Sequence, residues 1–140
     1  MTDGGTPINK LIEMRHKEYN LIKDTYCPLL NEIVYFNNKG FYHATHDGRG
    51  KIRGELDARM RLHLLPYIAT VIKKSNQFGS PARIIPNNSP NSKTGHELIF
   101  YELRHSLNTH KTISVILRKQ GNGQLHYFSV KYARKQNRLR

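Results

Sequence analysis

The strongest constraint on the fold is a change of pattern near residue 96, after which three segments alternate in residue type with a period of two. Residues 97–104, 111–119 and 124–132 read ELIFYELR, KTISVILRK and QLHYFSVKY, and all three are rich in β-branched and aromatic residues. This composition and alternation are typical of half-buried strands. The tetrapeptide QGNG lies between the last two segments and is a strong hairpin signal. The pattern therefore predicts an antiparallel meander over residues 96–133.

The alternation in the third segment also predicts which side chains share a face of the sheet. One face would carry Leu125, Tyr127, Ser129 and Lys131, and the other would carry His126, Phe128, Val130 and Tyr132. Most of these side chains are expected to pack the sheet. Ser129 is less ordinary, because a hydroxyl between two large apolar residues could contact a ligand from the sheet face.

The chain before residue 75 carries mainly helical patterns. Apolar residues spaced among charges predict a helix over 8–24 and a short helical turn over 29–34, with a break at Cys27-Pro28. After a turn, residues 41–53 are expected to form an extended segment that carries two histidines. A further helix is predicted to open at Gly54, with acids in its first turn, and to restart at Pro66.

The remaining segments are expected to be tails or loops. Residues 1–7 are polar and glycine-rich, residues 134–140 form a basic tail, and residues 75–95 are rich in Ser, Asn, Gly and Pro. A long loop over 75–95 is therefore predicted between the mainly helical part, 8–74, and the meander. Helices followed by antiparallel strands predict an α+β fold, and a chain of 140 residues fits a single domain.

The charge of the chain narrows the classes of function. Twenty-three Lys and Arg residues face ten Asp and Glu residues, for a formal net charge of +13, and no acid follows Glu102. So basic a chain is typical of nucleic-acid-binding proteins, although an anionic membrane surface or an acidic protein partner would also fit. No apolar run is long enough to predict a membrane span, and the N-terminus does not have the pattern of a signal peptide. The single cysteine, Cys27, allows no intrachain disulfide.

Two histidines lie close together in residues 40–63, which read GFYHATHDGRGKIRGELDARMRLH. A zinc site needs three or four ligands, and the chain offers too few cysteines and clustered carboxylates near His43 and His46. No metal site or cofactor is therefore predicted. Two interpretations stay open: the histidines are polar residues in a turn, or one of them performs acid–base chemistry near neutral pH.

Cations alternate with glycine and isoleucine just after the histidines. If this segment is extended, Arg49, Lys51 and Arg53 project to one side and could clamp a phosphate. A solvated basic surface is the alternative interpretation. The candidate RNA-binding residues, which include aromatics that could stack on a base, are Arg49, Arg59, Arg61, Tyr42, Tyr101, Arg104, Lys131 and Arg134.

The residue types favour one kind of RNA cleavage. Cleavage by the 2′-OH needs a base, an acid and a group that stabilises the charge on the phosphorane. Histidine, lysine, arginine and hydroxyl side chains provide these functions, whereas carboxylates that could hold Mg²⁺ are scarce. The composition therefore favours cleavage without a metal, if the protein cleaves RNA.

The order of these segments resembles the barnase–EndoU–colicin–RelE superfamily of ribonucleases, in particular its phage-type toxin branch. The resemblance depends on the histidine-bearing FYHATH, the helical ELDARMRLHLLPYIATVIKK and the final ISVILRKQGNGQLHYFSVKY, and it covers roughly residues 35–133. It implies N-terminal helices packed on a twisted antiparallel sheet of about four strands. By position it implies a catalytic histidine at His46 or His43, cationic residues at Lys51, Arg53 or Arg59, and an assisting hydroxyl at Ser129.

These expectations define a function and an alternative. The function is that of a metal-independent endoribonuclease toxin that cleaves tRNA or other RNA by 2′-OH attack, leaving a 2′,3′-cyclic phosphate. The resemblance further implies a cognate acidic immunity or antitoxin protein and action in the cytoplasm, with delivery as the C-terminal part of a secreted effector also compatible. The alternative is a non-catalytic RNA- or DNA-binding module, for example a ribosome-associated one.

Overall fold

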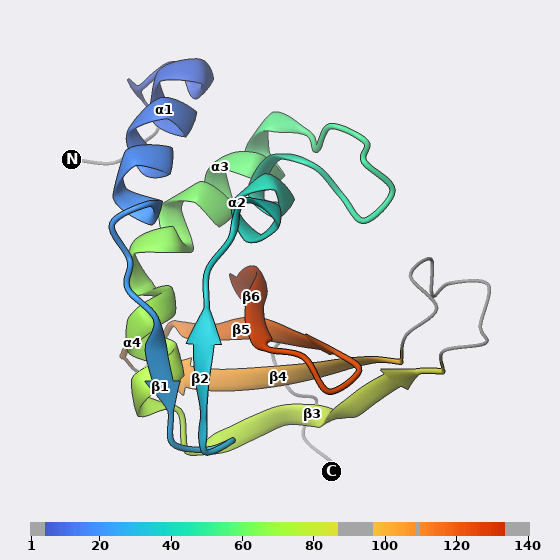
Figure 1. Cartoon of the computed structure of the whole chain (residues 1–140). Helices are drawn as coiled ribbons and strands as arrows, with labels where there is room; N and C mark the ends of the chain where they lie inside the picture. Colours follow the sequence, from blue (N-terminus) through green and yellow to red (C-terminus); the bar gives the residue numbers. More distant parts are fainter. Residues whose placement is uncertain (1–4, 87–96, 109, 134–140) are drawn as a thin grey trace, which may run out of the picture.

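A computed structural model describes residues 5–86, 97–108 and 110–133, which form an α+β fold. Helices pack on a six-stranded, mostly antiparallel open sheet with strand order β1-β2-β6-β5-β4-β3 (Figure 1). The helices are α1 (Ile8–Tyr19), α2 (Asn38–Thr45), α3 (Glu55–Leu64), the 3₁₀ turn η2 (Leu65–Tyr67) and α4 (Ile68–Lys74). The strands are β1 (Thr25–Cys27), β2 (Glu32–Tyr35), β3 (Gln77–Ile85), β4 (Leu98–Ser106), β5 (Thr112–Gln120) and β6 (Leu125–Tyr132).

The predicted meander is confirmed. Strands β4, β5 and β6 pair antiparallel in sequence order, and Gly121 has a φ of 57° in the turn between β5 and β6. Glycine tolerates this left-handed conformation, which explains the QGNG signal. The predicted helix opening at Gly54 is confirmed as α3, and Pro66 lies in η2, where the helix restarts.

The predicted loop over 75–95 is wrong for its first half, because residues 77–85 form β3. This strand pairs antiparallel with β4 at the sheet edge, and most of its residues are exposed. Two register irregularities, between Phe78 and Ser80 and between Ser80 and Arg83, break the alternation that identifies a strand. Residues 87–95 of the predicted loop lie outside the described part of the chain.

The helix predicted over 8–24 is confirmed for Ile8–Tyr19 and ends five residues early. The helical turn predicted over 29–34 is wrong for its second half, which belongs to β2, because pairing across the chain decides the backbone there. Strand β2 pairs antiparallel with β1 and parallel with β6, so the sheet has six strands where about four were expected. Periodicity within so short a segment could not indicate a partner more than 80 residues away.

The segment 41–53 is not extended throughout, because residues 38–45 form α2. Asn37 caps this helix, and its side-chain oxygen accepts a hydrogen bond from the Gly40 backbone N–H at 3.2 Å. Gly40 lies where a Cβ atom would come within 2.6 Å of the Tyr127 ring and 2.8 Å of the Tyr127 carbonyl oxygen. The glycine thus lets α2 approach β6 closely, which brings His43 to the sheet.

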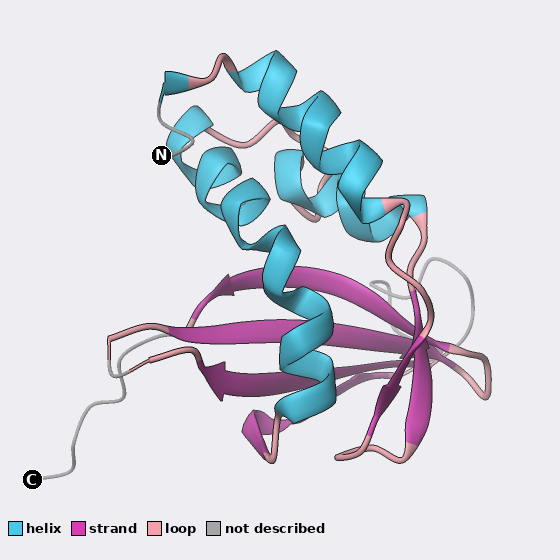
Figure 2. Ribbon diagram, turned by 90° about the vertical axis from the view of Figure 1, so that its left-hand side faces the viewer, coloured by secondary structure: helices cyan, strands magenta, loops and turns pink. Residues whose placement is uncertain are grey.

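The hydrophobic core lies between the sheet and the helices; in Figure 2, α4 crosses in front of the strands and the other helices lie above them. From β4 and β5 the core takes Leu103, Ile113, Val115 and Leu117, and from the helices it takes Leu62, Leu65, Ile68, Val71 and Ile72. All of these side chains are at most 2% exposed. We call the side of β3–β6 that faces away from α4 the open face, and the side that packs against α4 the covered face.

A β-bulge in β6 changes which side chains reach the open face. Ile116 pairs with Ser129 but the next residue, Leu117, pairs with Tyr127, so Phe128 is the extra residue. The prediction that Ser129 and Tyr127 share a face is therefore wrong. Val130 joins Tyr127 in the core, while Ser129 lines a pocket on the open face.

Candidate functional site

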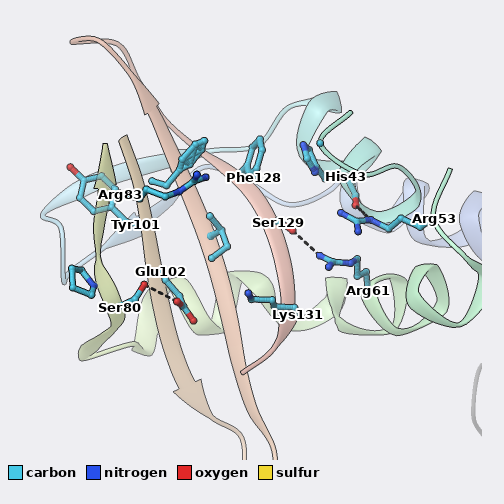
Figure 3. A pocket seen from close by; sticks show the side chains of 14 residues that line it. His43, Arg53, Arg61, Ser80, Arg83, Tyr101, Glu102, Phe128, Ser129 and Lys131 are labelled. Carbon is cyan, nitrogen blue, oxygen red and sulfur yellow. Dashed lines mark hydrogen bonds between the residues drawn. The ribbon is translucent and has the colours of Figure 1, made fainter. Parts of the chain in front are cut away.

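The open face carries a concave pocket of about 540 Å³. Figure 3 shows β3, β4, β5 and β6 forming its floor and α2, α3 and the segment before α3 forming one wall. Its charged and titratable lining residues are His43, Arg53, Arg61, Arg83, Glu102 and Lys131. Four cations therefore face one carboxylate, and an anionic ligand fits this balance.

Two arginines in the wall are held rigidly by one carboxylate. Asp57 accepts hydrogen bonds from Arg53 Nη1 at 3.1 Å and from Arg61 Nε at 2.9 Å. Burial alone would raise the pKa of Asp57, but hydrogen bonds and positive charge from Arg61 and Arg53 outweigh it, and the pKa falls below its usual range. The ionised Asp57 fixes both guanidinium groups before any ligand arrives, so little ordering entropy remains to be lost.

Each arginine also binds the structure that surrounds the pocket. Arg53 Nε donates to the His43 carbonyl oxygen at 2.8 Å, which ties the segment before α3 to α2. Arg61 Nη1 donates to Ser129 Oγ at 2.9 Å and to the Val130 carbonyl oxygen at 3.1 Å, which ties α3 to β6. The bulge at Phe128 is what presents the Ser129 hydroxyl to this arginine.

His43 lies in the last turn of α2 and lines the pocket. Its ring centroid is 4.0 Å from that of Phe128, at an interplanar angle of 48°. Burial, followed by the positive charges of Arg53, Arg118, Arg61 and Lys39, lowers the pKa of His43 from 6.5 to about 4. The imidazole is therefore neutral at pH 7 and can accept a proton.

Two more guanidinium groups lie over aromatic rings of the sheet. The Arg83 guanidinium carbon is 4.5 Å from the Phe100 ring centroid, and that of Arg118 is 5.1 Å from the Phe128 centroid. Burial lowers the pKa of Arg118, which still remains charged at neutral pH. No acidic side chain in the described part of the chain pairs with Arg83 or Arg118. Arg83 lines the pocket, so its positive charge is available to a ligand there.

Glu102 is the single acid of the pocket, and three neighbours bind it. Its carboxylate accepts hydrogen bonds from Ser80 Oγ at 2.9 Å, Ser114 Oγ at 2.6 Å and Arg104 Nε at 3.2 Å. Burial would raise the pKa of Glu102, but these hydrogen bonds and the charge of Arg104 lower it overall. The ionised carboxylate joins β3, β4 and β5 beneath the pocket.

The structure brings six of the predicted site residues to the pocket: His43, Arg53, Arg61, Tyr101, Ser129 and Lys131. Arg104 lies beneath it, bonded to Glu102. Arg59 does not line the pocket and pairs with Glu55 on the same helix, at 2.8 Å. Arg134 lies outside the described residues.

His46 lies apart from the pocket. Its ring stacks on Tyr42 with centroids 3.9 Å apart, and its Nδ1 is 2.8 Å from Thr45 Oγ1. Arg49 and Lys51 occupy an exposed loop that leaves α2 and returns to α3, visible beyond these helices in Figure 1. Asp47 shapes the loop by accepting hydrogen bonds from the backbone N–H groups of Arg49 and Lys51 at 2.8 and 3.0 Å. This loop does not present three parallel cations to the pocket, as the extended interpretation required.

Several residues that line the pocket or hold its lining in place were not predicted from the sequence. Arg83 was hidden in the predicted loop, and Phe128 was assigned to packing the sheet. The ion pairs of Asp57 could have been predicted from the sequence. Asp57 lies four residues from both Arg53 and Arg61, a spacing that favours ion pairs on a helix. Arg118 and Glu102 became identifiable only from strand register.

The described residues contain no group of three or more His, Cys, Asp or Glu side chains placed to hold a metal ion. Within the same ranges, no helix is both long and apolar enough to cross a membrane. No protein-family model matches the chain, and no curated protein or solved structure matches it either. The pocket itself therefore carries the functional inference.

Proposed function

We propose that this protein is a metal-independent endoribonuclease that acts at the pocket on the open face. The observation that carries the proposal is a neutral imidazole, His43, in the same pocket as two guanidinium groups fixed by Asp57. A proton acceptor beside rigid phosphate-binding donors is what cleavage by a 2′-OH requires.

The proposed step begins with a phosphodiester bound by Arg53, Arg61 and Lys131, all of which line the pocket. Neutral His43 Nδ1 or Nε2 accepts the proton of the 2′-OH as the 2′-oxygen forms a bond to phosphorus. The bond from phosphorus to the 5′-oxygen breaks, and the imidazolium returns its proton to that oxygen. The products are a 2′,3′-cyclic phosphate and a 5′-hydroxyl, so atoms and charge balance.

Substrate binding would also tune the base. A pKa of about 4 makes free His43 a weak base at neutral pH. The cations that lower this pKa, Arg53, Arg61 and Arg118, would share their field with the negative charge of a bound phosphate. We expect the pKa of His43 to rise towards neutrality in the complex, where a proton must be both accepted and returned.

More specifically, we propose that the protein is a toxin related to the barnase–EndoU–colicin–RelE superfamily. Support comes from helices α2–α4, which precede the antiparallel strands β3–β6, and from a histidine on the helical wall of a concave sheet face. A cation-lined pocket suits an acidic immunity or antitoxin protein as inhibitor, and tRNA in the cytoplasm is the first substrate to test.

A binding module without chemistry is the second candidate. The low pKa of His43 favours it, because an imidazole of this kind is a poor proton acceptor in the free protein. The same arginines would then retain RNA or DNA with a strong dependence on salt.

The deciding experiment incubates the protein with total tRNA in EDTA and maps the product ends. We expect discrete fragments with 2′,3′-cyclic phosphate ends, and a His43→Gln variant slower by roughly 10²–10⁴-fold. His46→Gln is the matched control, because His46 stacks on Tyr42 away from the pocket, and it should cleave like the wild type. Salt-sensitive retention of uncut tRNA by the wild type would instead establish the binding module.

A further inference from the structure

A second hollow of about 490 Å³ adjoins the cationic pocket at the edge of the sheet. It is lined by Phe78, Gly79, Ser80, Pro81, Ala82 and Tyr101. Ser80, Pro81 and Tyr101 line both hollows, so the two meet across the edge strand β3. The cationic pocket lies on the open face, whereas Phe78, which pairs with the core residue Leu103, and Tyr101 lie on the covered side of this edge. A ligand that passes around the edge would occupy both hollows with neighbouring parts of one molecule.

The chemistry of the second hollow differs from that of the first, because no charged side chain lines it. Its main side chains are two aromatic rings, Phe78 and Tyr101, with centroids 6.3 Å apart and planes inclined at 34°. Tyr101 packs partly against the core, whereas Phe78 is 44% exposed. An aromatic ring left this open at the rim of a cationic pocket is a candidate surface for a planar ligand.

The backbone of β3 does not suit the addition of another strand. Pro81 has no N–H to donate, and the register irregularities on both sides of Ser80 interrupt the edge. Gly79 lets β3 approach the side chains of β4 closely, since a Cβ there would lie 2.5 Å from Arg104 Nε and 2.7 Å from Glu102 Oε2. The interrupted edge therefore does not favour β-augmentation.

The charge of the protein argues against a second copy as the occupant. Each copy has a formal net charge of +13, and the hollow adjoins a pocket lined by Arg53, Arg61, Arg83 and Lys131. An occupant must carry negative charge at one end and an apolar planar group next to it. A nucleotide has both, joined covalently through the ribose.

We propose that the hollow at Phe78 and Tyr101 is a stacking site for one unpaired nucleobase of a single-stranded RNA whose phosphate lies in the cationic pocket. The inference deepens the proposed function and rests on it for the phosphate. Stacking on a ring is available to every base, so the site selects an unpaired nucleotide more than a sequence. A base inside a duplex could not reach Phe78 without unstacking.

The test measures binding separately from cleavage. Two labelled oligonucleotides of equal length and charge are used. One is a 2′-O-methyl RNA, which cannot be cleaved because it has no free 2′-OH to attack the phosphorus, and the other is its abasic counterpart. Phe78→Ala should weaken binding of the base-bearing strand by roughly tenfold and leave binding of the abasic strand unchanged. Phe78→Leu, which keeps an apolar side chain and removes the ring, should show the same selective loss.

Tyr26→Ala is the matched control, because Tyr26 is an equally exposed aromatic on β1 at the other edge of the sheet. It should change neither affinity, and thermal unfolding of each variant verifies that it folds. The stacking site is overturned if the wild type binds the abasic strand as tightly as the base-bearing one. It is also overturned by equal losses on both strands, or by wild-type affinity in Phe78→Leu, which would indicate a general apolar contact such as a protein partner makes.

The two proposals can fail independently. A protein that shows the Phe78-dependent difference but leaves tRNA uncut retains the stacking site and loses the ribonuclease assignment. A protein that cuts tRNA yet shows no dependence on Phe78 is a ribonuclease without this site.

Discussion

Strand β5 allows a direct comparison of the two faces of the sheet, because alternate residues of one strand enter opposite environments. Ile113, Val115 and Leu117 are fully buried against the helices. Ser114, between the first two, donates to Glu102, and Arg118, directly after Leu117, lies over the Phe128 ring. One strand thus contributes apolar burial to the covered face and polar, charged contacts to the open face.

The two faces divide stability from chemistry. The covered face excludes water with close-packed side chains, whereas the open face keeps charges that have been fixed by hydrogen bonds or by aromatic rings. Fixed charges in a concave site bind an anion without further ordering. Substitutions on the two faces should therefore change different quantities.

The largest effect on folding is expected from the covered face. Leu117→Ala removes a fully buried side chain between β4 and β6 and should lower the free energy of unfolding by about 2–5 kcal/mol. Chemical denaturation followed by circular dichroism measures this loss. Ile116→Ala, on the open face of the same strand, is the control and should cost clearly less, because Ile116 is only partly buried. Equal losses at the two positions would remove the distinction between the faces.

A substitution on the open face is expected to have a smaller effect, and to change the rate of RNA cleavage more than the stability of the fold. Arg61→Ala removes a guanidinium group that lines the pocket and should slow cleavage of RNA by roughly 10²–10³-fold, the usual cost of losing one charge-stabilising donor. The control is Arg59→Ala. It removes an arginine side chain two residues earlier in α3 that does not line the pocket, and this variant should cleave RNA near the wild-type rate. Rates are compared at saturating RNA after unfolding curves show that both variants fold. Similar rates in the two variants would place the phosphate elsewhere.

The covered face was largely predictable from sequence, and the open face was not. Alternation in β4, β5 and β6 gave the meander, and Pro66 gave the helix restart, because these signals are local. The bulge at Phe128 is a property of pairing between strands, so strict alternation placed Ser129 on the wrong face. Arg83 was missed for a related reason, since an exposed, irregular edge strand shows no apolar period.

The two histidines show the same limit within one short segment. His43 and His46 are three residues apart, and an extended backbone would have placed them on opposite sides. The close approach of Gly40 to Tyr127 instead brings α2 against β6, so His43 enters the pocket while His46 caps the helix and stacks on Tyr42. Sequence could nominate both residues, and only the tertiary contact distinguishes them.

The smallest expected effect is a pH dependence of stability that originates at His43. Its pKa is about 4 in the folded protein, owing to burial and to the charges of Arg53, Arg118, Arg61 and Lys39, and near 6.5 when unfolded. Between these values the unfolded chain binds a proton that the folded chain does not, so stability falls as the pH drops from about 6.5 to about 4. Because His43 is only half-buried, the loss should be well below that of Leu117→Ala.

Denaturation curves between pH 7 and pH 4 for the wild type and His43→Gln measure this contribution. Removing the imidazole also removes its contact with Phe128, which lowers stability equally at every pH and leaves the slope to report on protonation alone. The slope should therefore become shallower in His43→Gln within this window. Identical slopes would mean that His43 titrates normally in the folded protein, and that the cations of the open face do not hold its imidazole neutral for proton transfer.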